Sequence, residues 1–197
     1  AGRFSPIDRP GEVWITTQTV KDEPIDATHP IPAVSYKLDS PEAKLYLSAK
    51  QSVVRISLES VDADGKKKTS TGSGFFVTED GQIATASHVS NNKTLITVAT
   101  DDGRIYQARV KEERRTSELA VLELVDRKPG DQFKPLPLAK TAVGLERGEK
   151  LMVLGHPSGV TDVVMSLGTF RERVPMKSLL PKYENVLPNS MFLRADV

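Results

Sequence analysis

The stretch GSGFFVTEDGQIATASHVS, residues 72–90, predicts a β-hairpin that ends at a histidine. Its two apolar segments, GSGFFVT and QIATA, flank the turn sequence EDGQ, and an Asp-Gly pair between apolar runs is typical of a tight turn joining antiparallel strands. His88 follows the second segment behind small residues, which let a side chain stand clear of its own backbone. That placement suits a reactive imidazole and is also common by chance, so position alone leaves both interpretations open.

The same β pattern extends over most of the chain. The segment VVRISL at 53–58 alternates apolar and polar residues, and TLITVAT and RIYQARVK flank the turn sequence DDG. Further short apolar segments follow, namely ELAVLELV, EKLMVLG, DVVMSLG, TFRERV and MFLRADV. Short strands at close spacing, with turn signals between them and no long helical period, predict an all-β fold, an antiparallel sandwich or barrel.

One short helix is expected ahead of these strands, in DSPEAKLYLSAK at 39–50. Ser40 suits the N-cap, Pro41 suits the first helical position, and Glu42 suits the positive end of the helix dipole. The helix should end after about two turns, because the β-branched pair VV that follows favours a strand over a helix.

The first 39 residues differ from the rest of the chain, because they contain five prolines and few periodic apolar residues. We expect an extended arm over 1–39 that packs on the remainder of the protein or on a neighbouring chain and has no core of its own. Prolines limit ladder hydrogen bonds, so any strand in the arm should be short and at an edge. Trp14 and Ile15 are its strongest apolar pair and its expected anchors.

Composition narrows the possible functions. The 197 residues contain 27 Lys and Arg against 26 Asp and Glu, so the formal net charge of +1 offers no strong field to attract nucleic acid or an anionic membrane. No apolar run approaches the length of a membrane span. The absence of cysteine excludes disulfides, thiolate catalysis and cysteine-ligated zinc. His29, His88 and His156 lack a paired metal-ligand spacing, so no metal site is expected.

His88 has a possible carboxylate partner in Glu118, which opens the segment ELAVLELV on a different predicted strand. A carboxylate that accepts a hydrogen bond from one ring nitrogen leaves the other nitrogen free to take a proton from a nucleophile. A histidine at the end of one strand and a glutamate at the start of another are also ordinary surface residues. Spacing alone therefore does not decide between a catalytic pair and two unrelated side chains.

Four segments, taken together, resemble the trypsin-like serine proteases of the HtrA/Deg kind. GSGFFVTEDGQIATASHVS resembles the family's segment with the catalytic histidine, and ELAVLEL resembles its strand with the catalytic aspartate. GEKLMVLGHPSGV resembles the strand and turn that open the second barrel, and MFLRADV resembles the strand that leads to the nucleophile. The segments occur in family order from about residue 50 to 197, and residues 1–39 lie outside the resemblance.

The resemblance implies a fold of two perpendicular six-stranded β-barrels with the active site in the cleft between them. We then expect a protease domain over 40–197, with the first barrel at about 50–127 and part of the second at about 145–197. The family hydrolyses peptide bonds in protein or peptide substrates through an acyl-enzyme and needs no cofactor. The resemblance also implies that His88 is the general base and that Glu118 stands at the position of the aspartate. It further implies a periplasmic or other extracytoplasmic location.

Two departures from the family pattern stand out. Glu118 replaces an aspartate, and its side chain is one methylene longer. The Gly-x-Ser-Gly-Gly motif of the nucleophile is missing from the sequence, so we expect the serine beyond Val197, in the remainder of the same protein or in another subunit. Ser87 and Ser90 point away from His88 on the expected geometry, and Ser158 lies in a turn that is structural in the family.

The departures keep two other interpretations open. The protein could be an inactive pseudoprotease whose barrels serve as a binding or scaffold module, which the replacement of aspartate by Glu118 favours. It could also be a protease that is switched on by cleavage or by a partner, with the segment VPMKSLLPKYENVLPNS at 174–190 as the regulatory element.

Overall fold

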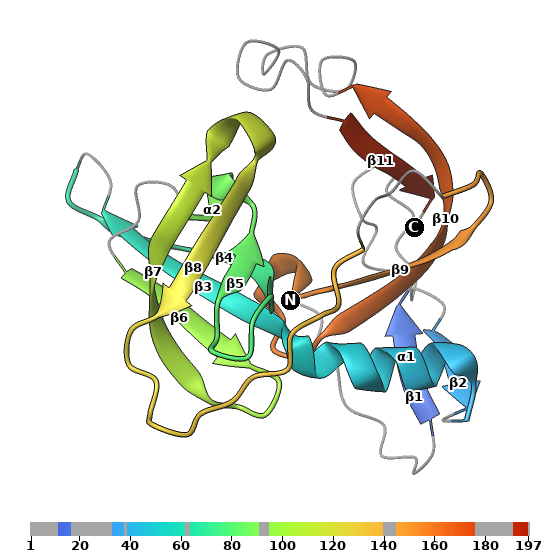
Figure 1. Ribbon diagram of the computed structural model, residues 1–197, viewed down its shortest axis with the longest axis horizontal. Helices are drawn as coiled ribbons and strands as arrows, with labels where there is room; N and C mark the ends of the chain where they lie inside the picture. Colours follow the sequence, from blue (N-terminus) through green and yellow to red (C-terminus); the bar gives the residue numbers. More distant parts are fainter. Residues whose placement is uncertain are drawn as a thin grey trace.

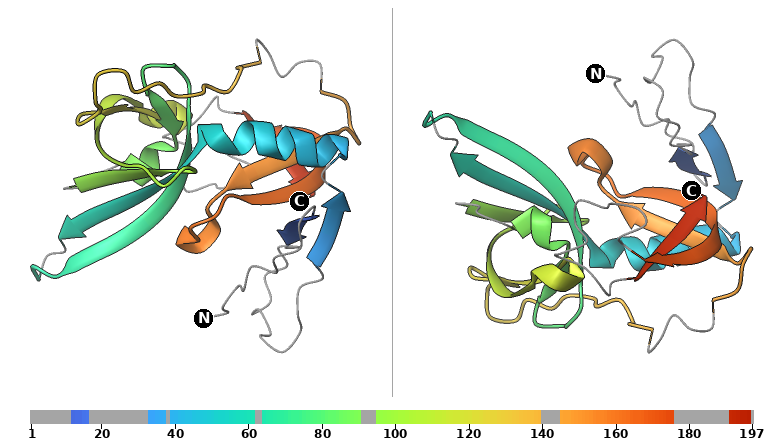
Figure 2. Two further views of the ribbon diagram at one scale, coloured as in Figure 1. Left: turned by 90° about the horizontal axis from the view of Figure 1, so that it is seen from below. Right: turned by 90° about the horizontal axis from the view of Figure 1, so that it is seen from above.

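The computed structural model describes residues 12–16, 33–37, 39–61, 64–90, 95–139, 145–175 and 191–196. Figure 1 shows two β modules side by side, a closed barrel made by the first half of the described chain and an open sheet made by the second half. The helix α1 (Pro41–Ala49) lies along one side of both modules, and the two views of Figure 2 agree with this arrangement.

The barrel contains the six strands that the alternating segments predict. They are β3 (Val53–Val61), β4 (Lys67–Phe76), β5 (Ile83–Thr85), β6 (Leu95–Thr100), β7 (Ile105–Arg114) and β8 (Leu119–Leu124). Every neighbouring pair is antiparallel, the order is β3-β4-β5-β8-β7-β6, and β3 pairs with β6 to close the barrel. Val54, Ile56 and Leu58 of β3 are buried on one face, as their alternation predicts.

The barrel core extends into the loop that follows β8, because Phe133 of that loop packs against core aromatic rings. Its ring centroid lies 4.5 Å from that of Phe76 and 5.5 Å from that of Tyr106, the latter edge-on. The hairpin turn approaches the same ring: Gly81 has φ of +88°, and a Cβ there would lie 2.9 Å from Phe133. The Asp-Gly signal in the sequence thus marks both a turn and a close contact.

The second module is a three-stranded antiparallel sheet in the order β11-β10-β9. Its strands are β9 (Lys150–Gly155), β10 (Val164–Pro175) and β11 (Met191–Asp196), with the 3-10 turn η3 (Pro157–Gly159) after β9. The segments DVVMSLG and TFRERV, expected as separate strands, form the single strand β10, and a bulge between Phe170 and Glu172 absorbs the irregularity. An open three-stranded sheet fits an incomplete second barrel.

The helix α1 begins as predicted. The Ala43 amide donates to the Ser40 hydroxyl at 3.1 Å, Pro41 occupies the first turn, and Glu42 is the acidic residue there. The turn η1 (Lys50–Ser52) connects α1 to β3. The Tyr46 hydroxyl donates to the Val163 carbonyl at 2.8 Å, which ties the helix to the turn between β9 and β10.

The arm contributes a two-stranded sheet of β1 (Glu12–Thr16) and β2 (Ala33–Lys37), with β1 against β10 and β2 against α1. The side chains of the expected anchors Trp14 and Ile15 lie outside the described residues, as does the segment 176–190. The domain boundaries 1–39 and 40–197 stay predictions.

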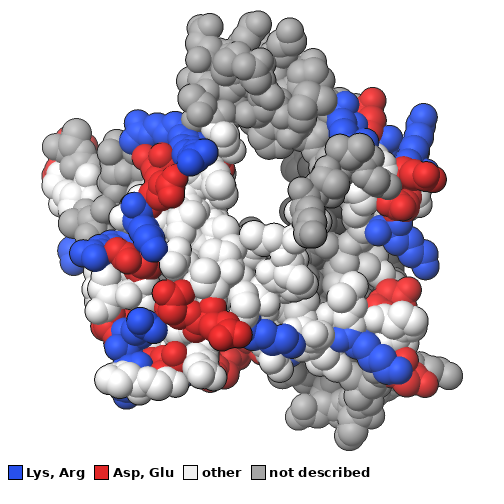
Figure 3. All heavy atoms as spheres, viewed as in Figure 1, with Lys and Arg blue, Asp and Glu red and all other residues white. Residues whose placement is uncertain are grey.

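Over the face in Figure 3, acidic and basic side chains are interspersed, as expected from nearly balanced charge. None of the described helices is long and apolar enough to cross a bilayer.

Candidate active site

The pairing of β5 with β8 brings the ends of two distant segments together. Thr85 of β5 pairs with Ala120 of β8, and two further hydrogen-bonded rungs fix this register. His88 lies three residues after Thr85, and Glu118 lies two residues before Ala120, at the same edge of the barrel. The two residues, thirty apart in sequence, therefore meet because of the sheet register.

His88 is part of a single helical turn, α2 (Ser87–Ser90), which is separated from β5 by Ala86 alone. Val89 is buried and belongs to the core, and a Cβ on Gly72 would lie 2.7 Å from its side chain. The Ser90 hydroxyl donates to the Ser87 carbonyl at 3.0 Å and closes the turn. Because Val89 fixes the turn from inside, the His88 side chain, 75% exposed, is held on the outside.

Glu118 occupies an uncommon backbone conformation. It follows the 3-10 turn η2 (Arg115–Ser117), and its φ of 53° and ψ of 38° lie in the left-handed region. This conformation costs an L-residue other than glycine roughly 1–2 kcal/mol. Strain of this kind persists only where the surroundings determine the backbone, and here the Glu118 carbonyl accepts from the Ser87 amide at 3.3 Å. No signal in the sequence indicated the left-handed backbone conformation of Glu118.

The Glu118 carboxylate accepts three hydrogen bonds from two consecutive residues. Oε1 lies 2.5 Å from His88 Nδ1 and 2.9 Å from the His88 amide nitrogen, and Oε2 lies 3.0 Å from the Ser87 hydroxyl. Burial acts to raise the pKa of the Glu118 carboxyl, but the hydrogen bonds from His88 and Ser87 outweigh it and lower that pKa below its usual range. The group is therefore an anion at neutral pH.

The charge on Glu118 determines the tautomer of His88. An ionised carboxylate can only accept hydrogen bonds, so Nδ1 must carry the proton that it shares with Oε1. In the neutral imidazole this leaves the lone pair on Nε2. Among the described residues, no hydrogen bond to Nε2 is present, and the ring is largely exposed. The expected contact between His88 and Glu118 is thus found; the catalytic roles assigned to them stay predictions.

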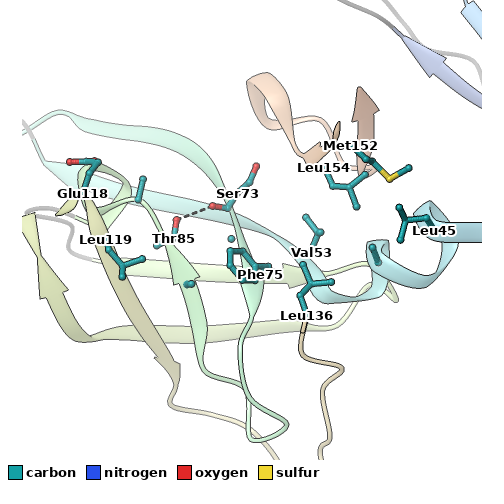
Figure 4. A pocket seen from close by; sticks show the side chains of 14 residues that line it. Leu45, Val53, Ser73, Phe75, Thr85, Glu118, Leu119, Leu136, Met152 and Leu154 are labelled. Atoms are coloured by element: carbon teal, nitrogen blue, oxygen red, sulfur yellow. Dashed lines mark hydrogen bonds between the residues drawn. The ribbon is translucent and has the colours of Figure 1, made fainter. Parts of the chain in front are cut away.

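An apolar groove of about 540 Å³ runs from Glu118 towards the second module. Figure 4 shows Glu118, Leu119 and Thr85 at one end and Met152, Leu154 and Leu45 at the other. The Thr85 hydroxyl donates to the Ser73 carbonyl at 2.8 Å, so it is already satisfied. Apolar side chains make up most of the groove lining, and Glu118 is the charged residue among them.

The three serines considered as nucleophiles lie in two different environments, two of them buried and one exposed. Ser87 and Ser90 are 3% and 5% exposed, and their hydroxyls donate to Glu118 Oε2 and to a main-chain carbonyl. Ser158 is exposed, with a left-handed φ of 53°, in the turn η3. The sequence indicated only that the Ser87 side chain points away from His88; its hydrogen bond to the carboxylate was not foreseen.

His156 is a structural residue of the turn after β9. It is 4% exposed, its amide donates to the Ser73 hydroxyl at 2.8 Å, and its Nδ1 lies 3.1 Å from the Val160 carbonyl. Burial lowers the pKa of His156, and the nearby Arg55 acts in the same direction. Within the described part of the chain, no group of three or more histidine and acidic side chains could hold a metal ion.

Comparisons with known proteins agree with this fold. The family described as trypsin-like peptidase domain matches residues 72–196. Serine protease HTRA4 of Mus musculus is 34% identical over 96 residues, which is 49% of this chain and 19% of that protein. The mitochondrial serine protease HTRA2 of Drosophila pseudoobscura pseudoobscura is 34% identical over 99 residues, 48% of this chain and 22% of that protein.

The matched part thus spans about a fifth of the length of these relatives. A solved structure of the HtrA-type protease AlgW with a tripeptide has a TM-score of 0.58 and 22% identity, and covers 68% of this chain and 40% of that chain. That likeness shows the fold. The chain belongs to the trypsin-like peptidase family, and within it is similar to the HtrA-type serine proteases.

Proposed function

We propose that this protein is a serine endopeptidase of the HtrA type, with His88 as the general base and Glu118 as the acid that orients it. One observation carries the proposal. His88 Nδ1 lies 2.5 Å from an ionised carboxylate, while Nε2 is free of hydrogen bonds to any described residue on a largely exposed ring. This is the arrangement that general-base activation of a hydroxyl requires.

In the proposed mechanism, His88 Nε2 takes the proton of a serine hydroxyl as its oxygen attacks the peptide carbonyl. The imidazolium that forms is stabilised by the negative charge of Glu118 and then gives its proton to the leaving amine. Water hydrolyses the acyl-enzyme by the reverse proton transfers, and no cofactor takes part. The nucleophilic serine is proposed to lie beyond Val197, since the Gly-x-Ser-Gly-Gly motif is missing from residues 1–197.

Glu118 suits the role despite its extra methylene. Its backbone lies in the left-handed region, and its carboxylate still reaches both the ring and the amide of His88. Two hydrogen bonds to one oxygen from one residue hold the imidazole in a fixed orientation. Loss of a proper orienting acceptor costs on the order of 10⁴ in rate in this mechanism, so the contact is the feature on which activity depends.

The second candidate function is a pseudoprotease that binds proteins without cleaving them. The replacement of aspartate by a strained glutamate favours it, because a decayed triad tolerates such a change.

Protein or peptide substrates and a periplasmic or other extracytoplasmic location are also parts of our proposal; they rest on the resemblance alone.

Hydrolysis of an unfolded protein substrate by the full-length protein tests the proposal. We expect turnover by the wild type, loss of turnover in His88→Ala, and near-normal turnover in Ser158→Ala. The second variant is the matched control, because Ser158 is exposed and lies in a separate turn. Absence of turnover in folded wild-type protein under activating conditions would favour the pseudoprotease, and loss of activity in Ser158→Ala would contradict the assignment of the nucleophile.

A further inference from the structure

The Ser87 hydroxyl is the only described side chain, apart from the His88 imidazole, that donates a hydrogen bond to the Glu118 carboxylate. It reaches Oε2 at 3.0 Å, whereas both His88 donors reach Oε1. The Ser87 side chain is 3% exposed, so water does not compete for this hydroxyl. A buried hydroxyl that bonds a charged oxygen contributes more than one that bonds a neutral group.

The bond to Oε2 restricts a motion that the His88 bonds leave open. A carboxylate held through one oxygen can still rotate about its bond to Cγ and carry Oε2 away from the protein donors. A second donor on the other oxygen fixes the plane of the group, and with it the direction of the Oε1 lone pairs. This restriction matters more for glutamate than for aspartate, because the extra methylene adds a rotatable bond.

Ser87 is itself held in place by the main chain. Its amide donates to the Glu118 carbonyl at 3.3 Å, so the backbone and the side chain of one residue both bind the other. The main-chain hydrogen bond therefore holds the Ser87 hydroxyl next to the Glu118 carboxylate. The same turn keeps the His88 amide directed at Oε1, which places all three donors on one rigid segment.

We propose that Ser87 is a positioning residue that holds the Glu118 carboxylate in the orientation that aligns His88, and that Ser87 and Glu118 form a matched pair. The inference deepens the proposed function and rests on it. Ser87 does not contact the substrate or the reacting atoms in this account. Its effect passes entirely through the carboxylate, so its removal should change the rate of the chemical step and leave substrate affinity unchanged.

The test compares Ser87→Ala with Ser90→Ala in the full-length protein. Ser90 is the matched control, since its hydroxyl is equally buried in the same turn but bonds a main-chain carbonyl and does not touch Glu118. We expect Ser87→Ala to lower kcat roughly tenfold with KM unchanged, as loss of one hydrogen bond to a charged group predicts. Ser90→Ala should stay within about threefold of the wild type.

A double-mutant cycle separates positioning from general structure. In the Glu118→Ala background, Ser87→Ala should add almost no further loss, because the acceptor of the Ser87 hydroxyl is already gone. Ser87→Cys keeps the side-chain connectivity but places a larger, weakly donating sulfur at the oxygen's position. It should resemble Ser87→Ala and serves as the second variant if the alanine variant does not fold. Equal losses from Ser87→Ala in both backgrounds would overturn the inference.

A spectroscopic measurement tests the role of Ser87 without requiring turnover. The Nδ1–H proton of His88, shared with Oε1, should give a low-field NMR signal in the full-length protein. We expect Ser87→Ala to shift or broaden this signal and Ser90→Ala to leave it in place. An unchanged signal in Ser87→Ala would refute positioning even if the protein proved to be an active protease, and a shifted signal would support it even if the protein showed no turnover.

Discussion

Replacement of Glu118 by glutamine removes the charge of the carboxylate while keeping its shape. The amide oxygen can still accept from His88, and the Ser87 hydroxyl can rotate to accept from the new amide group. The fold should therefore tolerate Glu118→Gln. What is lost is the attraction between the carboxylate and the imidazolium that forms during the reaction.

The size of the loss follows from the geometry. Two unit charges about 4 Å apart interact by about 4 kcal/mol at an effective dielectric constant of about 20. The His88 side chain is 75% exposed and that of Glu118 is 26% exposed, so solvent screens part of this attraction. If between half and all of it acts in the transition state, loss of the charge alone should lower kcat roughly 30- to 1,000-fold. An amide that also leaves the imidazole in the wrong tautomer should bring the loss towards about 10⁴.

Steady-state kinetics of the full-length protein, with active sites counted by titration, measure this effect. KM should stay within about twofold, because Glu118 is not expected to bind substrate. Thermal unfolding of the variant serves as the control for its fold. A kcat within threefold of the wild type, in a folded variant, would refute the argument that the carboxylate orients and stabilises His88.

Three further predictions concern other contacts. Glu118→Asp shortens the side chain by one methylene and withdraws the carboxylate from the Ser87 hydroxyl, so kcat should fall; a gain in kcat would contradict the matched pair. Burial lowers the pKa of His156 below its unfolded value of about 6.5, so the unfolded chain binds a proton more readily than the folded protein. Urea melts should therefore show the free energy of unfolding decreasing as pH drops below that value. In His156→Gln this decrease should be smaller. Phe133→Ala should cost about 3–5 kcal/mol of unfolding free energy, against less than about 0.5 for Leu138→Ala at an exposed position; a cost under 1 kcal/mol for Phe133→Ala would contradict its place in the core.

Much of the barrel could be predicted from local patterns. Alternation placed the buried face of β3, and the Asp-Gly pairs placed the turns beside β5 and β7. Ser40 and Pro41 gave the start of α1 correctly. These features depend on neighbours in the sequence, so a single sequence carries them.

The details of the site could not be predicted in this way. The left-handed backbone of Glu118 and the hydrogen bond from Ser87 arise only when β5 and β8 pair. The union of two expected strands into β10 depends on pairing with β9 on one side and β11 on the other. Contacts of this kind join residues far apart in sequence, and their geometry is decided by packing rather than by propensity.

Labelling of the full-length protein with a serine-directed fluorophosphonate, followed by peptide mapping, shows whether His88 activates a serine. A covalent label forms only on a serine whose hydroxyl is activated by its surroundings. We predict a label on one serine beyond Val197 that is lost in His88→Ala and retained in Ser158→Ala. A label on Ser158, or no label on folded and activated protein, would contradict the assignment of His88 as the base of a serine protease.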